Sequence, residues 1–142
     1  MASRKIEDCD QRLQDAWETA VANWNNKNGL IPCLSCTLRS PEEQAAVYAK
    51  GRTTPGNIVT NAKAYQSPHN FTPAQAFDFF FEKDNGQGGM VAVWNDKASY
   101  AEFRQLILDA DDTLVSGVSF KFVDADHIET PDWKKEFANQ IK

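Results

Sequence analysis

The sequence predicts an α+β fold in which several helices pack on a small, mainly antiparallel sheet. Two observations lead to this class. Some stretches have apolar residues at every third or fourth position, as amphipathic helices do, and other short apolar runs have the length of strands. The chain has 142 residues, of which 42% are hydrophobic and 25% are charged, enough for one globular domain. We therefore expect residues 1–142 to form a single domain.

Helices are expected wherever this helical spacing or a clear helix start occurs. The sharpest start is Ser40-Pro41-Glu42-Glu43, a capping box with proline at the first helical position. The first helix is indicated by its periodicity and is closed by Asn28-Gly29. The expected helices cover residues 6–26, 40–51 and 99–110, and a last helix follows Thr130-Pro131 with Trp133, Phe137 and Ile141 as its buried stripe.

Strands are expected in the apolar runs that separate these helices. The last run alternates in part, with Val118, Phe120 and Phe122 on one side, and ends just before Asp124. Residues 51–68 form a loop of unusual length for a compact domain, and such loops are usually functional or disordered. The expected strands are residues 30–38, 76–82, 90–94 and 114–123.

Charge and composition disfavour several kinds of partner. The net charge of −5 and the pI near 5.0 argue against nucleic acid, because phosphate binding needs clustered Lys and Arg. No apolar run approaches the roughly 20 residues that span a bilayer, so membrane insertion is not expected. The polar start of the chain does not resemble a secretory signal peptide. We expect a monomer that is made in a cytoplasm and has no signal peptide.

The three cysteines are Cys9, Cys33 and Cys36, an odd number that disfavours a disulfide framework. Cys33-x-x-Cys36 would need a second cysteine pair to form a structural zinc site. A redox pair would need a helix N-terminus, whereas the surrounding residues indicate a strand. Buried, reduced thiols are therefore expected.

The two histidines of the chain each lie near an aspartate. Asp78 follows His69 by nine positions, and His127 follows Asp124 by three. Zn²⁺ prefers four tetrahedral ligands, and a catalytic site takes three from the protein and leaves the fourth position for water. His69, Asp78 and His127 would make such a set.

The residues alone leave other interpretations of this set open. A single histidine is more often a hydrogen-bonded surface or core residue than a metal ligand. Asp78 stands between Phe77 and Phe79, so it either has a metal ion as its partner or alternates onto a solvent face of its strand. Spacing by itself does not choose between these alternatives.

Five short motifs follow one another over roughly residues 30 to 130, and together they are far more specific than any one alone. They are Arg39-Ser40-x-x-x-Gln44, the segment from Val47 to Thr60, Ser67-x-His69-Asn70, Ala76-x-Asp78 and Asp124-x-x-His127-x-Glu129. In this order they resemble a family of zinc peptidases. The family includes D-alanyl-D-alanine carboxypeptidases and the L-alanyl-D-glutamate endopeptidases of phage endolysins and bacteria.

The resemblance implies a metal centre and a catalytic acid/base. His69, Asp78 and His127 match the ligands of one Zn²⁺ ion, which lowers the pKa of a bound water toward neutrality. Asp124 matches the residue that takes a proton from this water and returns it to the leaving amine. From the residues alone, Asp124 would be a turn residue at a strand end.

The resemblance also implies two groups that contact the substrate. Arg39 matches an arginine that faces the scissile carbonyl or its neighbouring carboxylate and stabilises the charge that develops there. Ser67 matches a serine that binds the substrate or supports the first ligand. Without the resemblance, Arg39 would be a solvated charge at a strand end, and Ser67 a turn serine before Pro68.

The chain departs from the family pattern in three places. Many members have seven positions between the first histidine and the aspartate, whereas nine separate His69 from Asp78, so the intervening loop is expected to bulge. Residues 116–122 replace a run of tryptophan and glycine, which could reshape the substrate groove. Asp126 adds a carboxylate beside the last ligand, but Asp124 has the family's three-residue offset and is preferred as the base.

The function implied by the resemblance is hydrolysis of a peptide bond in the peptidoglycan stem, preferably the L-alanyl-D-glutamate bond. We expect a phage lysis enzyme that stays in the host cytoplasm until a holin gives it access to the periplasm and cell wall. The alternatives are a D-alanyl-D-alanine carboxypeptidase or dipeptidase, and a zinc-containing wall-binding module without turnover. Arg39 and Asp124 argue against the last, because binding alone needs no base beside the metal.

Overall fold

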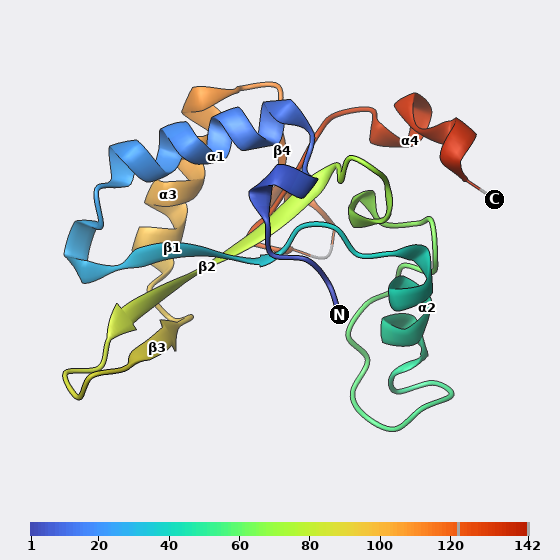
Figure 1. Cartoon of the computed structure of the whole chain (residues 1–142), viewed down its shortest axis with the longest axis horizontal. Helices are drawn as coiled ribbons and strands as arrows, with labels where there is room; N and C mark the ends of the chain where they lie inside the picture. The colour runs from blue at the N-terminus through green and yellow to red at the C-terminus, as the bar shows by residue number, and fades with distance from the viewer. Residues whose placement is uncertain (122, 142) are drawn as a thin grey trace.

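The computed structural model describes residues 1–121 and 123–141 and has the expected α+β architecture (Figure 1). All pairings between its named strands are antiparallel, so the predicted fold class is confirmed. The strands are β1 (Ile31–Cys36), β2 (Ala76–Asp84), β3 (Met90–Val93), β4 (Val115–Ser116) and β5 (His127–Glu129). The α-helices are α1 (Gln11–Trp24), α2 (Pro41–Ala49), α3 (Lys97–Ala110) and α4 (Trp133–Glu136).

Strand β2 is the centre of the sheet and separates the core from the open face. The strand order is β1-β2-β5-β4, and β3 also pairs with β2. Phe77, Phe79 and Phe81 are fully buried on the side of α1 and α3, where Trp24 stacks on Phe81 with ring centroids 5.2 Å apart. Because successive side chains of a strand point to opposite faces, Asp78 lies on the face away from these helices. Asp78 thus alternates out of the core, but its side chain is only 21% exposed and contacts His69 and His127, so it does not lie on a solvent face.

The expected first helix is divided into two parts. A 3-10 turn, η1 (Ile6–Asp8), is followed by α1. Asp10 is the N-cap of α1, and its side chain accepts a hydrogen bond from the Arg12 amide at 3.0 Å. Between the two parts, Cys9 forms a β-bridge with Ala74. The continuous helix predicted for residues 6–26 is wrong at its start, because this bridge and the Asp10 cap end the first turn.

The strand predicted for residues 114–123 is much shorter than expected. Among the described residues of this range only β4 is paired, because the Ser116 side chain accepts a hydrogen bond from the Val118 amide and turns the chain into η4 (Gly117–Ser119). Val118 is exposed, and Phe122 lies outside the described residues.

The last helix is also shorter than predicted. It begins after Asp132, which has a left-handed backbone conformation, and gives way to η5 (Ala138–Gln140). Of the expected stripe, Trp133 is buried, Phe137 is partly buried and Ile141 is exposed. None of the helices among the described residues is long and apolar enough to cross a bilayer.

The cysteines are free thiols, as expected. Cys9 and Cys36 are buried, but Cys33 is only partly buried, because it pairs with Phe80 on the face of the sheet away from α1 and α3. Burial raises the pKa of Cys9 to about 12. The expectation of buried thiols is therefore wrong for Cys33 alone.

Candidate metal centre and its cleft

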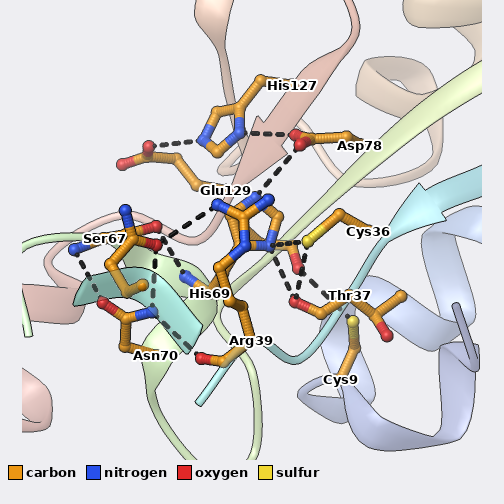
Figure 2. A network of polar contacts seen from close by, with 12 residues as sticks. Cys9, Cys36, Thr37, Arg39, Ser67, His69, Asn70, Asp78, His127 and Glu129 are labelled. Atoms are coloured by element: carbon orange, nitrogen blue, oxygen red, sulfur yellow. Dashed lines mark hydrogen bonds and ion pairs between the residues drawn. The ribbon is translucent and has the colours of Figure 1, made fainter. Parts of the chain in front are cut away.

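Two neighbouring strands, β2 and β5, and one turn bring the predicted ligands together (Figure 2). In the register of the sheet, Asp78 of β2 pairs with His127 of β5 on one side and with Cys36 of β1 on the other. His127 Nδ1 lies 2.8 Å from one Asp78 carboxylate oxygen. His69, on the 3-10 turn η3 (Pro68–Asn70), directs Nε2 to the other oxygen at 3.3 Å. His69, Asp78 and His127 thus converge, as the sequence predicted.

The orientation of His69 is set by the end of β1 and by Ser67. The Thr37 carbonyl oxygen lies 2.7 Å from His69 Nδ1, and the Cys36 sulfur lies 3.5 Å from the same nitrogen. Ser67 accepts a hydrogen bond from the His69 amide at 3.2 Å and so caps η3. Ser67 also lines the cleft described below, so its geometry accommodates both the supporting and the substrate-binding role.

The electrostatics of the set follow from two histidines that share one carboxylate. Burial by itself raises the pKa of Asp78, but the charge of His69 and hydrogen bonds from both histidines outweigh it and lower this pKa. Burial opposes protonation of the histidines, yet Asp78 raises the pKa of His69, and Asp78 with Glu129 raises the pKa of His127 to about 9. Positive charge is therefore favoured between these side chains, which is what a bound cation supplies.

The donor set fits zinc. Among the residues that the structure describes, two groups of side chains have ligand atoms within 4.8 Å of one another. Both groups contain Asp78: one adds Cys36 and His69, and the other adds Asp124 and His127, so the two histidines fall in different groups that Asp78 joins. Imidazole nitrogen and carboxylate oxygen are usual zinc ligands, as is thiolate sulfur. Cys36 was not predicted to be near the ligands, because only the pairing of β1 with β2 places it beside Asp78.

Asp124 is placed by a backbone turn that ends at His127. The Asp124 amide donates to the Gly117 carbonyl at 2.9 Å, and the His127 amide donates to the Asp124 carbonyl at 3.3 Å. Burial, together with a hydrogen bond to Asp124, raises the pKa of Asp126 to about 8. Asp124 lines the cleft that also contains the predicted ligands, a position that suits a base better than that of Asp126.

Arg39 is held by residues around η3. Its amide donates to the His69 carbonyl at 2.9 Å, and its Nη1 donates to the Gln44 side-chain oxygen at 3.2 Å. The Gln44 side chain is fully buried, and its oxygen also accepts from Asn70 Nδ2 at 3.2 Å. Its Nε2 donates to the Ala62 carbonyl at 2.8 Å. Gln44 therefore ties Arg39 to the turn that carries His69 and to the long loop.

These side chains line one cleft with a volume of about 1140 Å³. The long loop forms one wall, and it is held by Arg52, whose Nη1 donates to the carbonyls of Tyr48 at 2.6 Å and Thr60 at 3.0 Å. The loop is thus part of the cleft, in line with the functional alternative. The described residues that line the cleft include Arg39, Ser67, His69, Asp78, Asp124, His127, Glu129 and Trp133.

A small antiparallel sheet carries Asp78 and His127 on its open face, and the adjacent turn η3 carries His69; this fold and this set are those expected of a zinc peptidase. Among solved structures, the L-Ala D-Glu endopeptidase ChiX of Serratia marcescens has this fold. It superposes with a TM-score of 0.66 at 16% identity, over 93% of this chain and 86% of that chain. This likeness shows the fold.

A curated protein gives the more specific similarity. The peptidoglycan L-alanyl-D-glutamate endopeptidase CwlK of Bacillus subtilis (strain 168) is 39% identical over 72 residues. The match spans 51% of this chain and 40% of that protein, less than half its length. No family model matches the chain. The match to CwlK confirms the resemblance to the L-alanyl-D-glutamate endopeptidases over those 72 residues, and the likeness to ChiX adds the fold.

Proposed function

We propose that this protein is a zinc-dependent peptidase that hydrolyses a bond of the peptidoglycan stem peptide, with the L-alanyl-D-glutamate bond as its preferred target. One observation carries the proposal: His69, Asp78 and His127 converge in a cleft that also contains Asp124 and Arg39. A zinc ion would be held by the first three. When bound, it supplies Lewis acidity and lowers the pKa of water.

The remaining steps belong to side chains of the chain itself. Asp124 takes a proton from the attacking water and returns it to the amine that leaves as the peptide bond breaks. The products are a new carboxylate and a new amino terminus. Arg39 faces the substrate from the same cleft and stabilises negative charge on the carbonyl oxygen or on a neighbouring carboxylate of the stem.

The choice of bond rests on the relatives. CwlK and ChiX are both named as endopeptidases that cut between L-alanine and D-glutamate, and their similarity to this chain supports the same bond here. A D-glutamate residue carries a carboxylate beside the scissile bond, and the Arg39 guanidinium is a suitable partner for it. Residues 1–142 would then act as one catalytic domain and as a monomer.

The test is the release of new amino termini from purified peptidoglycan. We expect activity that is lost on chelation, returns with zinc, and is about 10²- to 10⁴-fold lower in Asp124→Asn, which keeps its metal. Identification of the new termini names the bond, and a terminal D-alanine product would instead favour the carboxypeptidase. If the zinc-loaded protein releases no termini, the peptidase proposal is wrong and the binding module takes its place.

We further propose that the enzyme serves bacteriophage lysis. It would remain in the host cytoplasm until a holin gives it passage to the periplasm and wall. Expression in a thin-walled host with and without a holin tests this proposal by culture turbidity. Lysis only in the presence of both proteins is expected. Lysis by the peptidase alone would contradict the need for a holin.

A further inference from the structure

The second ring nitrogen of His127 has a partner of its own. Nδ1 faces Asp78, whereas Nε2 lies 2.9 Å from Oε1 of Glu129 (Figure 2). The other Glu129 oxygen, Oε2, accepts a hydrogen bond from the Trp133 indole nitrogen at 2.6 Å. Both oxygens of this carboxylate are therefore engaged within the described part of the chain.

The chemistry of these groups fixes the direction of each hydrogen bond. An ionised carboxylate only accepts, and an indole N–H only donates. His127 Nε2 must therefore carry a hydrogen when it contacts Glu129. In the neutral imidazole the lone pair is then on Nδ1, the nitrogen directed at Asp78. A metal ligand needs this lone pair.

The backbone and the packing hold the side chains of His127, Glu129 and Trp133 in contact with one another. His127 and Glu129 are two residues apart on β5 and so share one face of the sheet. Their side chains are 7% and 14% exposed, so the bond between them is largely shielded from water. Trp133 is buried and packs on Phe71 with ring centroids 5.6 Å apart. The indole is thus a fixed anchor for Glu129.

We propose that Glu129, anchored by Trp133, is a positioning residue that presents Nδ1 of His127 to the metal. The inference rests on the proposed zinc site and adds to it the residues that orient one ligand. A carboxylate on the far nitrogen of a ligating histidine fixes its ring orientation and raises its basicity. Loss of such a partner typically lowers metal affinity by about 10- to 100-fold.

The experiment measures zinc affinity by competition with a chelator. The variants are Glu129→Ala, Glu129→Gln and Trp133→Phe, which keeps an aromatic ring but loses the N–H. Glu102→Ala is the matched control, because Glu102 is exposed on α3 and pairs with Lys27 at 2.6 Å. We expect a loss of about 10- to 100-fold for Glu129→Ala, smaller losses for the other two, and no change for the control. Thermal unfolding shows which variants are folded.

Nitrogen-15 NMR of the His127 imidazole gives a second readout, which shows which ring nitrogen carries the hydrogen and which the metal. If Glu129 only stabilised the fold, its loss would leave this assignment unchanged. In the zinc-loaded protein we expect a hydrogen on His127 Nε2 and the metal on Nδ1, and in Glu129→Ala a mixture of the two arrangements. Zinc on Nε2 in the wild type, or affinities of all three variants within twofold of wild type, would overturn the positioning role and leave the proposed peptidase intact. A wild-type protein that binds no zinc would overturn both proposals.

Discussion

Gly117 lies directly against the backbone of Asp124. A Cβ atom added to Gly117 would stand 2.2 Å from the Asp124 carbonyl oxygen and 2.9 Å from the Asp124 Cβ. Both distances are below ordinary contact, and the nearest atom is backbone, so it cannot move aside as a flexible side chain would. The position of the proposed base therefore depends on the absence of a side chain seven residues earlier.

Gly117→Ala is expected to displace Asp124 and to lower peptidase activity by about 10- to 100-fold, because a shift of roughly 1 Å in a catalytic group has an effect of that size. Zinc content should stay near that of the wild type. Gly89→Ala is the control, because its added Cβ would meet only the end of the Asn85 side chain, at 3.1 Å. Equal activity of the two alanine variants would contradict the role of Gly117.

Gln44→Leu should lower the free energy of unfolding and should disturb the position of Arg39 in the cleft. The substitution leaves Arg39 Nη1, Asn70 Nδ2 and the Ala62 carbonyl without the partner that Gln44 gives them. Each buried polar group left unpaired costs about 1–3 kcal/mol. Urea unfolding measures the loss, and KM for a stem peptide should rise as Arg39 loses its anchor. Gln105→Leu, on the exposed surface of α3, should change neither quantity. Wild-type stability of Gln44→Leu would show that these bonds are replaced by water.

Arg39→Ala is expected to lower kcat/KM by about 10²- to 10³-fold, the usual effect of removing one donor to a developing negative charge. Zinc affinity should not change, because a guanidinium has only donors and no lone pair to offer a metal. Arg39→Lys keeps the positive charge but loses the planar guanidinium, which can donate two parallel hydrogen bonds, so it should recover only part of the activity. Steady-state kinetics on a defined stem peptide makes the comparison. An alanine variant within twofold of wild type would remove Arg39 from the catalytic groups.

Zinc binding should become tighter as the pH rises toward 9. Burial by itself lowers the pKa of His127, but its hydrogen bonds to Asp78 and Glu129 together outweigh burial and raise this pKa to about 9 in the metal-free protein. At pH 7 its ring is therefore protonated, and a metal must displace that proton. Below pH 9 the apparent affinity should rise by about tenfold per pH unit for each proton released. Calorimetry in buffers of different ionisation enthalpy counts the protons. Binding without proton release would show that His127 is neutral before the metal arrives.

Local features of the chain could be predicted from the sequence, and contacts between distant segments could not. Helix α2 was found because its capping box is complete within four residues: the Glu43 amide donates to Ser40 Oγ at 3.0 Å, and the Ser40 amide donates to Glu43 at 2.9 Å. The proximity of Gly117 to Asp124 had no such signal, since the apolar residues around it predicted a strand. The turn made by Ser116 outweighed that pattern.

The candidate ligands were found for a different reason. His69, Asp78 and His127 were identified from the residue types and the motif order, and the structure brings them together. Their supporting partners were not identified. The Thr37 carbonyl that contacts His69 is a main-chain group. Every residue type has this group, so the identity of residue 37 gives no sign of the contact. Glu129 stood in a motif, but its contact with the far nitrogen of His127 becomes visible only in three dimensions.

The opposite directions of Asp78 and its phenylalanine neighbours on β2 limit which insertions and deletions the chain can tolerate. Adding or removing one residue within β2 would reverse the facing of every later side chain of the strand, so that a phenylalanine would enter the cleft and the carboxylate would enter the core. The segment between His69 and the start of β2 is not a strand, so its side chains do not alternate between two faces in this way. Length changes among related chains should therefore be found in that loop, in any number, and in the strand only in pairs.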